Sequence, residues 1–370
     1  MTAAPRPLRI CVIASSRFPI AEPFAGGLEA HTHALVSELR RRGHEVSLFA
    51  APGSDPDLGV LELSVEPFSS SDAAREDIAA PPEWWMREHH AYLDLMLDLT
   101  RRPGRFDVVH NNSLHHLPIA MAPSLDVPVV TTLHTPPVPW LESAIGLASG
   151  RGGSCRFVAV SDATRRQWAP RVAASVVHNG VDPERWPAGR GGRRAVWSGR
   201  LVPEKAPHEA VRAALLAGVP LDLVGPLGDR GYVAREVAPH LGDPDDPHAP
   251  VRYLGHLDQR ALSAVVGAAA VAVVTPAWEE PFGLVAAEAM CSGTPVAAVA
   301  RGALPELVTG ATGRLAAPGD VEALARAIRE AAGLDRAAVR EEAVARFGLV
   351  AMVDAYERVY RDVVRQADAA

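Results

Sequence analysis

Two glutamates on either side of a glycine, Glu280 and Glu288 around Gly283, are the residues of this sequence best suited to chemistry. They lie in the stretch Pro276–Pro295, where an apolar run gives way to a helical pattern, which predicts the order strand, loop, helix start. Free N–H groups at a helix start bind phosphate. Carboxylates would repel that phosphate, so we expect Glu288 to face a ribose diol and Glu280 the hydroxyls of a sugar. The stretch predicts a nucleotide-sugar site, although the spacing alone would also fit two solvated carboxylates.

The composition is typical of a globular protein with two domains. Of the 370 residues, 48% are hydrophobic and 22% are charged, and this length exceeds what one hydrophobic core usually serves. The formal net charge of −7 gives the whole chain no attraction to nucleic acid or to anionic lipid.

Three widely spaced cysteines, Cys11, Cys155 and Cys291, fit neither a disulfide framework nor a metal site. They are expected to be buried thiols in a reducing compartment. The apolar run Leu8–Ala14 is short for a signal peptide, and Ala261–Pro276 is broken by polar and small residues. We therefore expect a cytoplasmic protein.

The first half of the chain begins with a predicted strand and a glycine pair. Leu8–Ala14 is apolar apart from Arg9, as expected of a parallel strand covered on both faces. Gly26 and Gly27 then precede a helical pattern that Glu29 opens, and glycines there let backbone amides approach a ligand. No G-x-G-x-x-G occurs, which argues against a dinucleotide-dependent dehydrogenase.

Polar residues follow four predicted strands of this half. They include His110, His134, Ser161 with Asp162, and the run from His178 to Asp182. Open α/β sheets bind ligands at the carboxyl ends of their strands, so this edge is the expected ligand side. A single histidine there is more often a structural hydrogen-bonding group than a catalytic one.

The second half follows Pro183–Arg194, whose prolines and glycines predict a linker and hinge. A strand pattern resumes at Ala195 and leads into Gly199, Arg200 and Lys205. Two cations five residues apart are usually surface charges. Here the preceding strand and glycine favour a site. Further strands alternate with helices, which predicts a second parallel sheet.

Several of these segments resemble the family-4 retaining glycosyltransferases of GT-B fold, from Gly26 to Gly313 in matching order. The Glu-x7-Glu stretch, with Pro-Phe-Gly after its first glutamate and Glu-Ala-Met around its second, closely resembles the family signature. Thr132-Leu133-His134 is similar to the family's Thr-x-His. Gly199 to Lys205 is similar to its Gly-Arg-Leu-x-x-x-Lys-Gly, except that Ala206 replaces the last glycine, which leaves the shape of this loop open.

The resemblance implies an α/β fold of GT-B type, with two Rossmann-like βαβ domains facing a deep cleft. The N-terminal domain, residues 1–188, would bind the acceptor, and the C-terminal domain, residues 195–347, would bind the nucleotide-sugar donor. The last helix, about residues 348–370, would return to the first domain.

It also implies roles for individual residues. The implied catalytic residues are His134, Arg200, Lys205 and Glu280. The implied donor-binding residues are Gly26, Gly27, Gly199, Arg200, Lys205, Gly255, Glu280, Phe282, Gly283, Leu284 and Glu288. Glu29 and His110 are the implied acceptor contacts, the long excursion Ala51–Pro82 is expected near the acceptor, and no metal ligand is implied.

The implied reaction is transfer of a hexose, with retention, from a nucleoside diphosphate sugar to a hydroxyl or amine. Arg200, Lys205 and the helix start would hold the leaving diphosphate in place of a metal ion. No cofactor is expected beyond the nucleotide-sugar co-substrate. UDP is the commonest nucleotide of such donors in the family. Asp55-Pro56-Asp57 and Asp243-Pro244-Asp245 match the Asp-x-Asp of metal-dependent enzymes, but in proline-rich loops, so we interpret them as structural.

Other functions stay open at this point. A nucleotide-sugar epimerase or hydrolase of the same fold would use the donor without an acceptor, and a sensor would bind it without turnover. A membrane-associated lipid glycosyltransferase is permitted by Arg40–Arg42 and by Arg101 with Arg102, although arginines at helix ends are usually solvated. The acceptor could be a secondary metabolite, a polysaccharide or a lipid.

Overall fold

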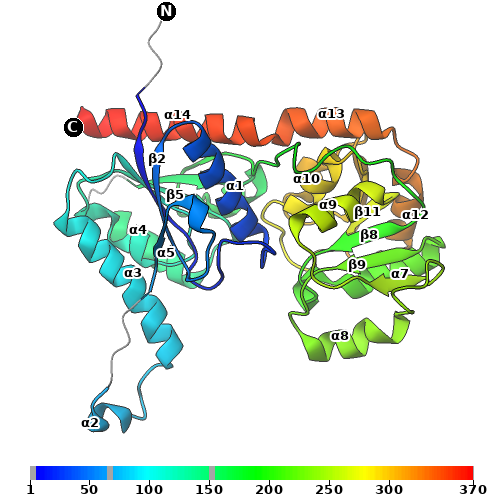
Figure 1. The fold of residues 1–370 in the computed structure, drawn as a ribbon, viewed down its shortest axis with the longest axis horizontal. Coiled ribbons are helices and arrows are strands. Elements are labelled where there is room, and N and C mark those ends of the chain that lie inside the picture. Colours follow the sequence, from blue (N-terminus) through cyan, green and yellow to red (C-terminus); the bar gives the residue numbers. More distant parts are fainter. Residues whose placement is uncertain (1–5, 65–69, 150–154, 370) are drawn as a thin grey trace, which may run out of the picture.

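The computed structural model describes residues 6–64, 70–149 and 155–369, and these form two parallel β-sheets, each flanked by helices (Figure 1). The first sheet has the strand order β3-β2-β1-β4-β5-β6-β7 and the second the order β10-β9-β8-β11-β12-β13. Every recorded strand pair is parallel, for example Ile10 opposite Val46 and Val108. The α/β class and the two-sheet organisation predicted from the sequence are confirmed.

The strands of the first sheet are β1 (Arg9–Ile13), β2 (Glu45–Ala50), β3 (Val60–Glu62), β4 (Val108–Asn111), β5 (Val129–Leu133), β6 (Cys155–Ala159) and β7 (Ala174–Val176). Its helices are α1 (Gly27–Arg41), α2 (Asp72–Arg75), α3 (Glu83–Arg101), α4 (Leu117–Ala120), α5 (Pro139–Ser149) and α6 (Asp162–Trp168). The central strands are buried on both faces, and in β1 this burial corresponds to the apolar run Ile10–Ile13.

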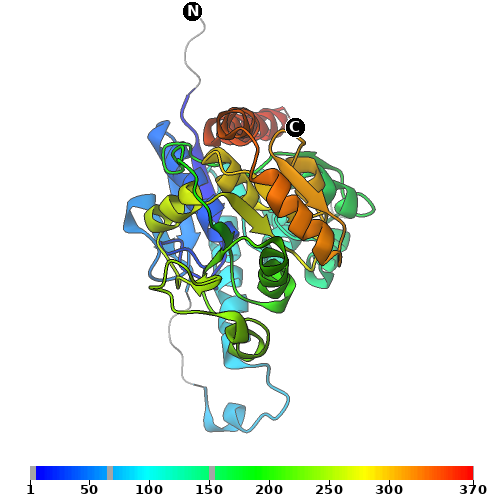
Figure 2. The same ribbon diagram turned by 90° about the vertical axis from the view of Figure 1, so that its right-hand side faces the viewer.

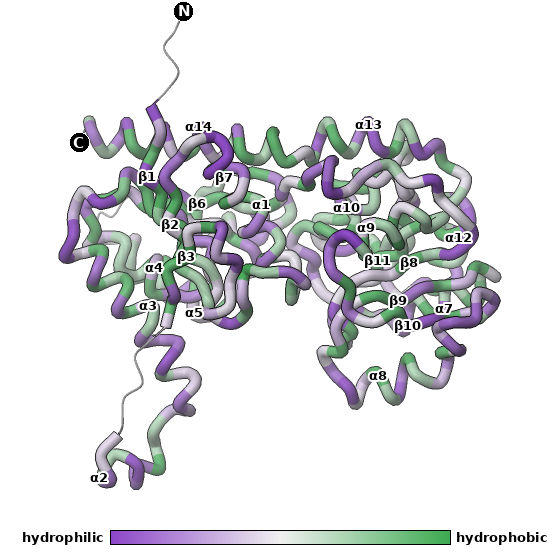
Figure 3. Tube along the Cα trace, viewed as in Figure 1, coloured by the Kyte–Doolittle hydropathy of each residue, from purple (hydrophilic) through white to green (hydrophobic). Residues whose placement is uncertain are grey.

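The strands of the second sheet are β8 (Ala195–Ser198), β9 (Leu221–Val224), β10 (Val251–Tyr253), β11 (Val271–Val274), β12 (Val296–Val299) and β13 (Gly313–Ala316). Its helices are α7 (Pro207–Ala217), α8 (Arg230–Glu236), α9 (Gln259–Ala268), α10 (Leu284–Cys291), α11 (Leu304–Leu307), α12 (Val321–Ala331) and α13 (Arg336–Phe347). Hydrophobic residues, green in Figure 3, concentrate along the strands of both halves.

The last helix, α14 (Leu349–Asp368), follows α13 across the molecule and packs on the first sheet (Figures 1 and 2). Tyr356 and Tyr360 of α14 share one hydrophobic cluster with β1 and α1. The Tyr360 hydroxyl lies 2.7 Å from Nδ1 of His110 on β4. Arg42, at the end of α1, bonds Glu357 of α14. The predicted return of the C-terminal helix to the first domain is confirmed.

The predicted linker Pro183–Arg194 contacts the second half. A side chain at Gly189 would approach the carbonyl oxygen of Gly267, on α9, to 2.0 Å. The Arg336 side chain donates to the carbonyl of Gly189, and that of Arg340 donates to the carbonyl of Trp186. These contacts join Trp186 and Gly189 of the linker to the second half, while most of the other linker residues are exposed. The proposed domain limits at residues 188 and 195 stay a prediction.

The long excursion Ala51–Pro82 contains three short elements among its described residues. It carries a short 3₁₀ helix, Pro56–Leu58, the edge strand β3 and the short α2, while residues 65–69 lie outside the described residues. Asp55 accepts a hydrogen bond from the amide of Asp57 and lies 3.1 Å from His33, so it serves as a cap in this segment. α2 and the start of α3 extend away from the first sheet (Figures 1 and 2).

Within the described residues, none of the helices combines the length and the apolar character that a bilayer crossing demands.

Replacement of Tyr360 by Phe is expected to lower the free energy of unfolding by about 1–3 kcal/mol, because it leaves the buried His110 nitrogen without a partner. Urea denaturation followed by circular dichroism measures the loss. Arg358→Ala, on the exposed face of the same helix, is the control and should change the stability by no more than about 0.5 kcal/mol. Equal losses in the two variants would contradict the role given to this bond.

Candidate active site

The loop between β11 and α10 has the backbone shape that the sequence predicts. Gly283 has φ 94° and ψ 53°, a left-handed conformation that favours glycine. A side chain there would also approach Cδ2 of Leu304 to 2.8 Å. Leu284 opens α10, and the first N–H groups of a helix have no partner within it. The loop therefore presents backbone donors beside the glutamates.

The backbone of Glu280 is held from one side by the segment before α11. Gly302 has φ 57°, and a Cβ on it would lie 2.1 Å from the carbonyl oxygen of Glu280. The amide of Ala303 donates to that oxygen at 2.8 Å, and the amide of Gly302 donates to the carboxylate of Glu279 at 3.0 Å. Only a glycine at 302 permits this close approach.

The Glu280 carboxylate is paired with Lys205. Lys205 Nζ lies 2.5 Å from Glu280 Oε2, and the indole N–H of Trp278 donates to the same oxygen at 3.1 Å. The ammonium also lies 5.1 Å from the centre of the Trp278 ring. Both charged side chains are largely shielded from solvent, with 25% and 12% exposed. The ion pair therefore joins the segment after β8, which carries Lys205, to the segment after the neighbouring strand β11, which carries Glu280.

The loop that carries Lys205 has the left-handed turn expected of a glycine, although alanine occupies it. Ala206 has φ 45° and ψ 52° and is the non-glycine residue of positive φ in the described part of the chain. The hydroxyl of Thr275 donates to the carbonyl oxygens of Lys205 and Ala206, each at 3.0 Å. These bonds stabilise the left-handed turn at Ala206.

The glycine pair of the first half faces the start of α10. A Cβ on Gly27 would lie 3.5 Å from Cδ2 of Leu284, and Glu29 Oε2 lies 3.3 Å from the Cβ position of Gly26. Glu29 is buried, and burial raises its pKa, an effect that the positive charge of Arg200 opposes. Arg200 itself is exposed at the end of β8. Residues predicted from both halves thus meet across one junction.

A cavity of about 440 Å³ lies between α1, the segment 180–186, α10 and the start of α14. Glu288 and His31 line it. Both nitrogens of the buried His31 lack a partner in the described structure. Burial raises the pKa of Glu288 to about 8, so its carboxyl is largely protonated at neutral pH. Buried polar groups without partners favour binding of a polar ligand.

Three glycines bring the strand ends of the second sheet close together. Gly199 donates from its amide to the carbonyl of Val224, and Gly225 donates to the carbonyl of Gly255. A Cβ on Gly225 would lie 1.9 Å from the carbonyl oxygen of Gly199. Gly225, which follows a strand as Gly199 does, was not singled out from the sequence, although that position could have indicated it.

Two predicted contacts need correction. His110 is fully buried, with Nε2 at 2.8 Å from Thr132 Oγ1 and Nδ1 bonded to Tyr360. It has no surface to offer an acceptor and belongs to the scaffold under α14. The Phe282 side chain packs in the core against Phe347, with ring centres 5.8 Å apart, so only its backbone is available to a donor.

His134 lies where the sequence predicts, at the carboxyl end of β5. Its Nε2 is 2.5 Å from Asn112 Oδ1, and its ring packs against His31. Burial lowers the pKa of His134 well below its usual value, so the ring is neutral at neutral pH. Its Nε2 is engaged with Asn112, an interaction that the sequence did not indicate.

The sequence also missed the contacts that join the two halves near this loop. The hydroxyls of Ser161 and Thr164, at the start of α6, donate to the carbonyl of Pro281 at 2.6 and 3.0 Å. The Glu306 carboxylate accepts hydrogen bonds from the Asp162 amide and lies 2.6 Å from His178 Nε2. Each residue stands at a strand end or in a motif, but nothing local pairs them.

Replacement of Glu288 by Gln is expected to change how stability depends on pH. The native carboxyl, with its pKa raised to about 8, keeps a proton that the unfolded chain loses near pH 4.5. The wild type therefore loses free energy of unfolding as pH rises between these values, by at most about 1.4 kcal/mol per pH unit. The variant should escape this loss.

Urea unfolding at pH 5.5 and 7.5 tests the expectation. The stability difference between Glu288→Gln and the wild type should grow in favour of the variant at the higher pH. Glu341→Gln, at an exposed position, should follow the wild type at both values. The same pH dependence in all three proteins would contradict the raised pKa.

Comparison with family models divides the chain close to the junction of its two sheets. Residues 25–185 match Glycosyltransferase Family 4, and residues 182–343 match Glycosyl transferases group 1. The glycogen synthase of Mycobacterium tuberculosis is 31% identical, with 89% of this chain and 88% of that protein covered. The D-inositol 3-phosphate glycosyltransferase of Mycolicibacterium paratuberculosis is also 31% identical, with 97% and 91% covered.

Solved structures share the fold at lower identity. HepE of Anabaena, in complex with UDP and glucose, has a TM-score of 0.71 at 19% identity, covering 96% of this chain and all of its own. Sucrose-phosphate synthase of Thermosynechococcus elongatus has a TM-score of 0.71 at 21% identity, covering 97% of this chain and 100% of its own. With the two matched families and the two-sheet architecture, the chain belongs to the family 4 glycosyltransferases and is a glycosyltransferase enzyme of GT-B fold.

Proposed function

We propose that this enzyme transfers a hexose from a UDP-sugar to a hydroxyl or amine acceptor with retention of anomeric configuration and without a metal ion. The observation that carries the proposal is the Lys205–Glu280 pair, 2.5 Å apart beside the left-handed Gly283 at the start of α10. A cation, a carboxylate and free backbone donors in one place match the parts of a nucleotide-sugar.

Negative charge on the leaving diphosphate has to be stabilised when the sugar–phosphate bond breaks. Lys205 and the exposed Arg200 supply positive charge, and the N–H groups at the start of α10 supply donors. Ionic and dipolar groups held in position stabilise developing charge without reorganisation. These groups take the role that a divalent cation has in metal-dependent glycosyltransferases, and no other cofactor is needed.

The two glutamates bind different hydroxyl groups of the donor. Glu288 lines the cavity, and its carboxyl makes no hydrogen bond to the described residues, so it is free to bond a ribose diol. Glu280 is fixed by Lys205, Trp278 and the backbone contacts of Gly302 and positions the transferred sugar. His134 contributes to the sugar site from the first half.

The reaction exchanges one bond at the anomeric carbon for another on the same face. The bond from that carbon to the phosphate oxygen breaks, and its electron pair leaves with the diphosphate. A bond to the acceptor oxygen or nitrogen forms, and the acceptor's proton passes to the departing phosphate oxygen. In this scheme no protein side chain acts as the nucleophile.

UDP is the proposed nucleotide of the donor because structural neighbours have been crystallised with UDP and with UDP-glucose. The curated relatives act on different acceptors, as their names indicate, so the acceptor of this enzyme is proposed only as a nucleophilic hydroxyl or amine. It would bind on the first half, at the carboxyl edge of its sheet, where Glu29 lies near Arg200.

Loss of either partner of the central pair is expected to lower turnover strongly. Glu280→Ala and Lys205→Ala should each reduce kcat by about 100- to 1,000-fold, because each removes a group held at the reacting bond. UDP release from a panel of UDP-sugars in the presence of mixed acceptors measures the rate, and circular dichroism checks the fold.

A neighbouring acidic residue provides a matched control. Glu204→Ala removes an exposed carboxylate one position from Lys205 and should keep kcat within a few-fold of the wild type. Near-normal turnover in Glu280→Ala or Lys205→Ala would rule out this site.

The configuration of the product and the response to hard cations test the mechanism. Nuclear magnetic resonance of the product from an α-linked UDP-sugar should show an α-linked glycoside. Added Mg²⁺ or Mn²⁺ should not raise kcat. A β-linked product would refute retention, and rapid loss of the donor without an acceptor would indicate a hydrolase or an epimerase.

A further inference from the structure

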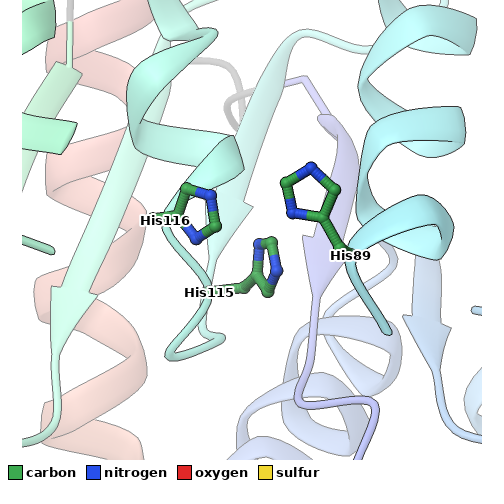
Figure 4. Close-up of side chains that lie close together, drawn as sticks. All are labelled: His89, His115 and His116. Atoms are coloured by element: carbon green, nitrogen blue, oxygen red, sulfur yellow. The ribbon is translucent and has the colours of Figure 1, made fainter. Parts of the chain in front are cut away.

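Three histidines lie together on the first half, away from the Lys205–Glu280 pair. His89 comes from α3, and His115 and His116 come from the segment between β4 and α4. One ligand nitrogen from each ring can be chosen so that all three lie within 4.8 Å of one another. Figure 4 shows the rings grouped around a common space, with His89 on one side and the other two opposite it.

Each ring is held in position by an aromatic neighbour. Trp85 stacks on His89, with ring centres 5.2 Å apart and planes 8° from parallel. Tyr92 stacks on His115 at 4.1 Å, and Trp140 of α5 stacks on His116 at 4.7 Å. The orientation of the rings is thus set by packing before any ligand binds, which is the condition for a precise metal site.

The polar atoms of the cluster are poorly satisfied by the protein. Nδ1 of His89 is buried and has no hydrogen-bond partner in the described structure. Nδ1 of His115 accepts a bond from the amide of Leu117 only at 3.3 Å. A neutral imidazole offers the lone pair of one ring nitrogen to a ligand. A buried nitrogen without a partner costs free energy unless a ligand satisfies it.

We propose that His89, His115 and His116 bind one Zn²⁺ ion. Imidazole nitrogens suit zinc and its neighbours among the transition metals, whereas Mg²⁺ and Ca²⁺ require oxygen ligands. Three protein nitrogens leave the fourth position of a tetrahedral ion for water or another small ligand. If His115 binds the ion through Nε2, its Nδ1 carries the proton. Nδ1 can then no longer accept the 3.3 Å hydrogen bond from the Leu117 amide.

The ion would connect two elements that otherwise meet through side-chain packing. It would join α3, whose first turns extend beyond the sheet, to the segment that follows β4 at its carboxyl end. Because only the folded chain brings the three rings together, zinc should stabilise the native state. This role is separate from the donor diphosphate, which the cations and backbone of the second half hold.

The test uses the full chain without an affinity tag, treated with EDTA and then freed of the chelator. Titration with ZnCl₂ in a calorimeter should show one ion bound per chain, and thermal unfolding should move to higher temperature. Visible absorption after addition of CoCl₂ should show the bands of a tetrahedral or five-coordinate ion with nitrogen ligands. Absence of stoichiometric zinc binding would overturn the proposal.

Variants assign the binding to these rings. His89→Ala and His116→Ala should each weaken zinc affinity by more than about tenfold and abolish the thermal shift. His90→Ala changes the next residue of α3, outside the cluster, and should bind as the wild type does. If all three variants bind equally well, the zinc is an adventitious ion only. His116→Gln, at the half-buried N-cap of α4, replaces His89→Ala if that variant fails to fold.

Discussion

The loop that carries Glu280 is held by both halves of the molecule, and the rest of the site depends on this attachment. The carbonyl of Pro281 accepts hydrogen bonds from Ser161 and Thr164 of the first half, while the amide of Ala303 holds the carbonyl of Glu280 from the second. The carboxylate points at Lys205 because its backbone is anchored on both sides. The position of the Glu280 carboxylate therefore depends on the assembled pair of sheets.

The main features of the fold were predictable because they leave a local pattern. Strands covered on both faces, such as β1 and β11, read as continuous apolar runs. The return of α14 to the first half was expected from the family resemblance alone. The contacts of Pro183–Arg194 with the second half were not predictable. They include the contact of Gly189 with Gly267, and a close approach of two backbones across the fold has no signature in either segment.

In the candidate site, too, residues in local motifs were predictable and contacts between distant segments were not. The proximity of Glu280 and Lys205 was predictable because both stand in motifs at strand ends, and strand ends of a parallel sheet converge on one edge. His110 was misassigned because its partner Tyr360 lies 250 residues further along the chain, so its burial is invisible in its own segment. Trp278 was overlooked because its indole N–H reaches the Glu280 carboxylate only in the folded loop. Nothing in the sequence of the loop indicates that contact.

The crossing of α14 has a consequence for biosynthesis. The first sheet is synthesised before the second, yet part of its hydrophobic core comes from Met352, Tyr356 and Tyr360, which follow the second sheet in the chain. Domains generally fold in the order of their synthesis. Here the first half keeps an apolar face uncovered until α14 has been synthesised, while the intervening half can complete its own core. The nascent chain therefore exposes hydrophobic surface for as long as the second half takes to be made.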